Sequence, residues 1–223
     1  MENTDWLNSQ DNYLIYFGDT MCSWCYGFAE ELSDLANANP EVPLKVVNGG
    51  LRPHGTTKNG DVVPEFGNQV MSEFLRHHWE EVNKRSGQPF SYAILDDESF
   101  IYDTEPAARA CIVAREMNPE LEFEFFKEVQ KAFYARGMNT NELATFITIA
   151  SKLGFDVDEF QMKFNSDEMK RATVQDFQLS ANLGIKGFPS LVLKKGTEFF
   201  LIANGYNEAK NIQPVIDKIF SDN

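Results

Sequence analysis

The chain has 223 residues, of which 43% are hydrophobic, enough to fill the core of one large domain or of a domain that carries an insertion. Its 34 acidic residues outnumber 20 Lys and Arg, and the resulting net charge of −14 disfavours binding to nucleic acid or to an anionic membrane. Because the N-terminus lacks a secretory signal pattern and no apolar run approaches transmembrane length, we expect a cytoplasmic protein without a membrane partner.

The first part of the chain predicts a β-α-β unit. Residues 12–18 read as an apolar strand, and the following helix repeats apolar residues on one face until Pro40 ends it. A second strand is predicted over 43–48, where the glycine pair Gly49-Gly50 closes it. The turn at the first crossover is therefore the place where we expect a functional group.

The middle of the chain, residues 64–183, is almost entirely helical in its periodicity. Thr104 is predicted to open one helix, with Pro106 in its first turn. Further helices are predicted over 121–134, 143–153 and 157–164. The sequence thus predicts a small α/β layer that is interrupted by a helical insertion.

The C-terminal part predicts a β-hairpin and a helix. The strands are expected over 190–193 and 198–202, with Gly196 in the turn between them. For the last helix we expect Asn211 as the N-cap, Pro214 in the first turn, and one apolar stripe. The predicted stripe comprises Ile212, Val215, Ile216 and Ile219.

A Cys-x-x-Cys motif, Cys22-Ser23-Trp24-Cys25, stands where the first strand gives way to its helix. At a helix N-terminus the unpaired N–H groups and the macrodipole favour thiolate over thiol, which makes Cys22 the candidate nucleophile. Cys25 follows after one helical turn on nearly the same face, where it can attack a mixed disulfide and release the substrate. The motif therefore indicates thiol–disulfide chemistry.

A zinc site and a purely structural pair of cysteines are the other interpretations of this motif. A structural zinc site takes four Cys or His ligands, and no further residues stand at a paired ligand spacing. The remaining candidates are Cys111, His54, His77 and His78. We therefore favour redox chemistry and expect no metal. Cys111 lies among alanines on a predicted helix face and fits a small buried hydrophobe.

Three motifs together resemble the DsbA family of thioredoxin-fold thiol:disulfide oxidoreductases, and most of all its FrnE-like branch of protein disulfide isomerases and oxidoreductases. They are residues 21–28 (MCSWCYGF), 104–107 (TEPA) and 186–190 (KGFPS). The resemblance covers essentially the whole chain. It implies an α/β, thioredoxin-like fold with a large all-helical insertion: a discontinuous thioredoxin-like domain of residues 1–63 and 184–223, and an insertion domain of residues 64–183.

The resemblance also implies roles for residues around the motif. Pro189 would be a cis-proline beside the cysteines, and the backbone of Phe188 would pair with an extended substrate. Ser23 and Trp24 would complete the substrate-binding surface. At Tyr16 many thioredoxin-fold redox proteins carry a buried carboxylate that exchanges a proton with the resolving thiol.

A tyrosine with an ordinary pKa cannot act as that base at neutral pH. Proton transfer at Cys25 would then need water, Asp19 or another group, although Asp19 fits a simple turn residue better.

From these observations we expect a disulfide reductase or isomerase that acts on disulfide-containing proteins or small thiols. No bound cofactor is expected, and glutathione or a thioredoxin-like partner would regenerate the dithiol. Two alternatives stay open: a glutathione-dependent isomerase or transferase of the same fold, and a non-catalytic adaptor that senses redox state. The oligomeric state is not predicted.

Overall fold

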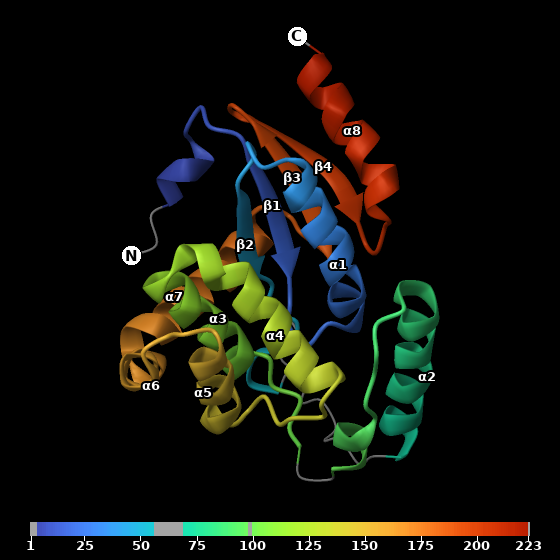
Figure 1. Cartoon of the computed structure of the whole chain (residues 1–223), viewed down its shortest axis with the longest axis vertical. Coiled ribbons are helices and arrows are strands. Elements are labelled where there is room, and N and C mark those ends of the chain that lie inside the picture. Colours follow the sequence, from blue (N-terminus) through green and yellow to red (C-terminus); the bar gives the residue numbers. More distant parts are fainter. Residues whose placement is uncertain (1–3, 56–68, 98–99, 223) are drawn as a thin grey trace.

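A four-stranded mixed sheet in the order β2-β1-β3-β4 forms the centre of one part of the molecule (Figure 1). The computed structural model describes residues 4–55, 69–97 and 100–222. β1 pairs in parallel with β2 and antiparallel with β3, which in turn is antiparallel to β4. The strands are β1 (Tyr13–Gly18), β2 (Leu44–Asn48), β3 (Ser190–Lys195) and β4 (Glu198–Asn204).

Six of the described helices, α2 to α7, lie between β2 and β3 in the chain, as the predicted insertion requires. The α-helices are α1 (Ser23–Ala38), α2 (Gln69–Ser86), α3 (Glu105–Met117), α4 (Glu122–Tyr134), α5 (Leu143–Lys152), α6 (Val157–Asn165), α7 (Asp167–Asn182) and α8 (Ala209–Ser221). Short 3-10 turns span Thr4–Leu7, Pro53–Gly55, Ala93–Asp96 and Pro119–Leu121. The α/β architecture with a helical segment between its strands is confirmed.

The two faces of the sheet are covered by different helices, because side chains alternate along each strand. Leu14 and Tyr16 of β1 belong to the large buried cluster that includes residues of α1 and α8. Ile15 and Phe17 point to the other face, where Leu179 of α7 packs against them. In Figure 1 α1 and α8 lie in front of the sheet, and the carboxyl end of β1 points toward the lower group of helices.

One buried cluster continues from the sheet and α1 into α3 and α4. Trp79 of α2 and Cys111 of α3 are almost wholly buried in it, which confirms that both belong to the core. The predicted boundary at residues 63 and 64 lies outside the described residues, and the division into two domains stays a prediction.

The last helix begins earlier than the sequence predicts. α8 starts at Ala209, whose N–H donates to the Glu31 carboxylate of α1 over 2.6 Å. Asn211 is therefore not the N-cap, and Pro214 lies inside the helix. Val215 is also exposed rather than part of the buried stripe, which Ile212 and Ile216 form. The cap comes from a distant helix, which no local signal reveals.

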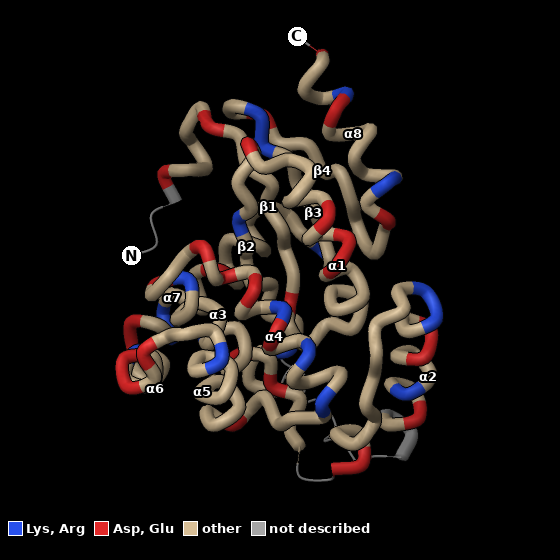
Figure 2. Tube along the Cα trace, viewed as in Figure 1, with Lys and Arg blue, Asp and Glu red and all other residues tan. Residues whose placement is uncertain are grey.

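Charged residues of both signs alternate along α2 and α4 instead of forming a face of one sign (Figure 2). Within the described ranges, none of the helices combines the length and the apolar character needed to cross a membrane.

Candidate redox site

The turn between β1 and α1 is organised by Asp19. Its two carboxylate oxygens accept hydrogen bonds from the backbone N–H of Met21 (2.9 Å) and of Leu51 (2.7 Å). The first bond is the local turn contact that the sequence predicts for Asp19, and the second ties the turn to the segment after β2. Because Asp19 is buried, its pKa rises to about 6 in spite of these hydrogen bonds.

Cys22 occupies the N-cap position of α1, with extended backbone angles and an amide that donates to the Asp19 carbonyl over 3.1 Å. Its sulfur therefore lies at the end of a 16-residue helix where unpaired N–H groups and the positive dipole end favour an anion. The Sγ is 3.6 Å from the Phe188 carbonyl oxygen, and the residue is 9% exposed. Cys22 is the cysteine of the motif that a substrate can reach.

Cys25 lies behind Cys22 and is completely buried. Its sulfur accepts a hydrogen bond from the Asp19 N–H over 3.5 Å. Burial raises the pKa of the Cys25 thiol well above its ordinary value, and the neighbouring Cys22 raises it further.

The Phe188–Pro189 peptide bond is cis and lies directly before β3. The Pro189 carbonyl accepts a hydrogen bond from the Gly205 N–H over 2.7 Å, which fixes the loop to the end of β4. The Phe188 ring lies against Gly49, where any Cβ atom would overlap it. The glycine pair that was predicted to close β2 thus leaves room for the aromatic ring beside Cys22.

An open, largely apolar hollow of about 400 Å³ adjoins these residues. It is lined by Trp24, Arg85, Phe188, Gly205 and Tyr206. The guanidinium of Arg85 lies 5.3 Å from the centre of the Tyr206 ring and forms an ion pair with Glu208 over 2.9 Å. The Trp24 and Tyr206 rings are 5.8 Å apart.

The structure brings Cys22, Trp24, Phe188 and Pro189 together and buries Ser23 in the first turn of α1. Their roles in substrate binding stay predictions. Sequence reasoning missed Arg85 and Tyr206, because they come from α2 and the segment after β4 and carry no motif. His54 is exposed, as expected for a surface histidine.

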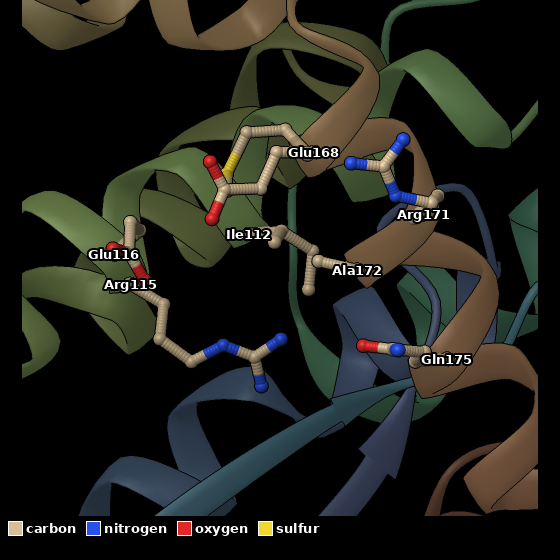
Figure 3. A pocket seen from close by; sticks show the side chains of 8 residues that line it. Ile112, Arg115, Glu116, Glu168, Arg171, Ala172 and Gln175 are labelled. Atoms are coloured by element: carbon tan, nitrogen blue, oxygen red, sulfur yellow. The ribbon is translucent and has the colours of Figure 1, made fainter. Parts of the chain in front are cut away.

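A second hollow, of about 290 Å³, lies between α3 and α7 (Figure 3). Its lining carries two arginines and two glutamates, so the charges balance. None of its lining residues belongs to the cysteine motif or to the cis-proline loop, and we assign no chemistry to it. Across the part of the chain that the structure describes, no three His, Cys, Asp or Glu side chains gather into a metal site.

The comparisons with known proteins agree with this geometry. The family model of the DSBA-like thioredoxin domain matches residues 13–213. A candidate protein disulfide isomerase from Nitrosomonas europaea is 33% identical, with a TM-score of 0.84 over 95% of this chain and 98% of that one.

The cytosolic disulfide reductase DsbM from Pseudomonas aeruginosa has a TM-score of 0.73 at 19% identity, over 94% of this chain and 98% of its own. Its structure with glutathione gives a TM-score of 0.71 at 20% identity, over 94% and 99%. No curated protein matches the chain. The predicted thioredoxin-like fold is confirmed, and the chain belongs to the family of the DSBA-like thioredoxin domain, with a Cys-x-x-Cys motif at the expected turn.

Proposed function

We propose that the protein is a cytoplasmic disulfide reductase or isomerase in which Cys22 attacks the substrate disulfide and Cys25 resolves the mixed disulfide. The observation that carries the proposal is the unequal placement of the two sulfurs. Cys22 lies at a helix N-terminus beside the Phe188 carbonyl, whereas Cys25 is sealed behind it. A nucleophile needs access and a stabilised thiolate, and a resolving thiol needs only its partner.

A cytoplasmic location would favour reduction of substrate disulfides over their formation. Consider a dithiol/disulfide pair with a reduction potential as high as about −120 mV in a cytosol whose glutathione potential is about −250 mV. The dithiol form of this pair would be favoured by about 6 kcal/mol. In the cytoplasm the Cys22–Cys25 pair would therefore be held reduced and ready to attack disulfides. The fold-level likeness to a cytosolic disulfide reductase, which also has a structure with glutathione, supports this direction and a low-molecular-weight thiol as the regenerating donor.

The hollow beside Cys22 is the place where we expect the substrate to bind. Trp24 and Phe188 both line this hollow and offer apolar contact, and the Phe188 backbone lies close to the reacting sulfur. Pro189 directly precedes β3, and Ser23 lies within the first turn of α1. Substrates with apolar groups next to the half-cystine would fit this surface.

The test is the reduction potential of the Cys22–Cys25 pair, measured in defined glutathione buffers by thiol alkylation and mass. We expect a reversible two-electron transition confined to these cysteines. Its reduction potential should be about −270 mV for a reductase, or above about −200 mV for an isomerase. Cys22→Ser should abolish turnover of a disulfide substrate, whereas Cys111→Ala should retain it. A pair that forms no reversible disulfide would contradict the proposal and favour a redox-independent adaptor.

Turnover of a non-disulfide substrate with glutathione, in place of disulfide reduction, would favour the isomerase or transferase alternative. That reaction does not need a resolving thiol, so Cys25→Ser would leave it intact. A disulfide reductase with the same substitution would accumulate the mixed disulfide at Cys22 instead.

A further inference from the structure

The Tyr16 hydroxyl is buried close enough to the Cys25 sulfur to lower the pKa of that thiol. The residue lies on β1, six positions before Cys22, and is 1% exposed. Its ring packs against the rings of Phe28 and Phe126, with centroids 6.1 and 5.7 Å away. The tip of the ring passes so close to Gly18 that a Cβ atom there would overlap it. The ring is thereby held in one orientation.

The Tyr16 hydroxyl has no hydrogen-bond partner among the described residues, sulfur atoms included. A buried hydroxyl without an acceptor is unfavourable and calls for an explanation. The Cys25 sulfur is the neighbour that interacts with it, and it becomes a good acceptor when it is a thiolate. Burial and the adjacent Cys25 raise the pKa of Tyr16 well above its ordinary value, so the hydroxyl keeps its proton and acts as a donor.

A second neutral donor reaches the same sulfur. The Asp19 N–H lies 3.5 Å from the Cys25 Sγ, on the turn that directly follows Gly18. Both the hydroxyl and the amide lower the pKa of Cys25, against the larger effect of its burial. Two donors that converge on one buried sulfur make a small pocket for a negative charge.

We propose that the Tyr16 hydroxyl, together with the Asp19 amide, hydrogen-bonds the Cys25 thiolate while this thiolate attacks the mixed disulfide on Cys22. The proposal rests on the function proposed above. It gives Tyr16 a direct part in the reaction, as a donor at the position where related proteins carry a carboxylate.

The resolving step conserves atoms and electrons. The Cys25 thiol first gives its proton to water. Its thiolate then attacks the Cys22 sulfur, the Cys22–substrate S–S bond breaks, and the electron pair leaves with the substrate thiolate, which takes up a proton. Cys22 and Cys25 end as a disulfide, oxidised by two electrons, and the substrate disulfide has been reduced by two. Tyr16 keeps its own proton throughout.

The experiment follows one turnover of the reduced protein with dithionitrobenzoate (DTNB) in a Cys111→Ala background. Attack by Cys22 releases the first nitrothiobenzoate, and attack by Cys25 releases the second. In Tyr16→Phe we expect the first release to stay within about twofold of the parent. The second should slow about ten- to hundredfold, the usual effect of removing a hydrogen bond to a charged group.

The matched control is Tyr26→Phe, which removes a buried tyrosine hydroxyl that donates to the Pro89 carbonyl over 3.1 Å. It should leave both releases within about twofold of the parent. A second release that is unchanged in Tyr16→Phe, or equally slow in both variants, would overturn the role of Tyr16. A parent protein that releases only one nitrothiobenzoate would instead overturn the proposed function itself.

A second measurement remains valid if Tyr16→Phe folds less well. In a Cys22→Ser background, the Cβ chemical shift of Cys25, followed by NMR as the pH changes, reports the thiolate without a reagent that must reach the buried sulfur. We expect the midpoint of this titration to move to higher pH by about one unit or more when Tyr16 is replaced by Phe. An unmoved midpoint would overturn the inference, whatever the stability of the variant.

Discussion

Two buried polar regions of this protein handle negative charge in different ways. In the redox turn, formed by Tyr16, Asp19, Cys22 and Cys25, the donors to the Asp19 carboxylate and to the Cys25 sulfur are neutral backbone amides, and we propose the Tyr16 hydroxyl as a further donor to that sulfur. The ionic cluster lies behind β2 and consists of Arg115, Glu122, Asp176 and Asn48. In this cluster Arg115 forms ion pairs with the carboxylates of Glu122 and Asp176.

The difference follows from what each region does. A sulfur that gains and loses a charge in every reaction is best served by donors that carry no net charge, because an unpaired fixed cation would be left behind. A cluster whose charges take no part in the proposed reaction can use an arginine. Arg115 pairs with Asp176 over 3.1 Å and with Glu122 over 3.5 Å, and it also donates to the Val46 carbonyl.

The strongest test of this comparison removes a carboxylate from the ionic cluster. Asp176 is wholly buried and accepts hydrogen bonds from both the backbone and the side-chain nitrogen of Asn48. In Asp176→Ala Arg115 loses the closer of its two carboxylate partners and Asn48 loses its acceptor, so we expect the free energy of unfolding to fall by about 3–5 kcal/mol. Urea denaturation measures this.

The control for this variant is Asp167→Asn on the same helix. Asp167 is exposed and pairs with Lys170 over 3.1 Å at the surface, where solvent screens the interaction and leaves it little effect on stability. If the two variants lose the same stability, the ionic cluster does not have the structural role that we assign to it.

The pH dependence of stability tests Glu122. Burial raises the pKa of Glu122 to about 7, although Arg115 opposes the rise. The folded state therefore binds a proton more tightly than the unfolded state, and this contribution to stability is present at acid pH and is lost as pH rises through about 7. Relative to the parent, Glu122→Gln should gain up to about 3 kcal/mol of unfolding free energy between pH 5 and pH 8.

The measurement compares urea denaturation of the two proteins across this pH range. Glu120→Gln, at an exposed position in the neighbouring turn, should keep the pH slope of the parent. A Glu122→Gln protein with the parental slope would show that Glu122 is ionised in the folded protein at all these pH values.

The smallest expected loss of stability comes from Gly49, which joins the two regions. A Cβ atom at Gly49 would overlap the Phe188 ring, and Asn48 beside it is held by Asp176. Gly49→Ala should cost about 1–3 kcal/mol through overpacking. Because the displaced ring carries the Phe188 carbonyl away from Cys22, disulfide turnover should fall about tenfold or more.

Gly187→Ala is the matched control, since a Cβ atom at Gly187 meets open space next to the same phenylalanine. Its turnover should stay close to that of the parent. Equal losses in the two variants would mean that the position of the Phe188 ring does not control the reaction.

The features that depend on residues close together in the chain could be predicted from the sequence. The strand, the Cys-x-x-Cys turn and the helix after it are local signals, and the resemblance added Pro189 across the sheet. The contact between Asp176 and Asn48 joins residues that are 128 positions apart in the chain, and no local sequence pattern predicts it. Tyr16 was recognised only as a departure from a carboxylate, because its use depends on where Gly18 and Cys25 lie around its hydroxyl.

Glu31 of α1 links the hollow beside Cys22 to the helix that begins at the cysteine motif. Its carboxylate accepts hydrogen bonds from the Tyr206 hydroxyl over 3.3 Å and from the first N–H of α8 over 2.6 Å. Since Trp24 is itself part of α1, two walls of the hollow are fixed to the same helix as the nucleophile. Under the proposed function, an incoming disulfide would meet a surface that is already assembled, so the entropy lost on binding would be mainly its own, and stiff, compact disulfides would gain an advantage over long flexible ones.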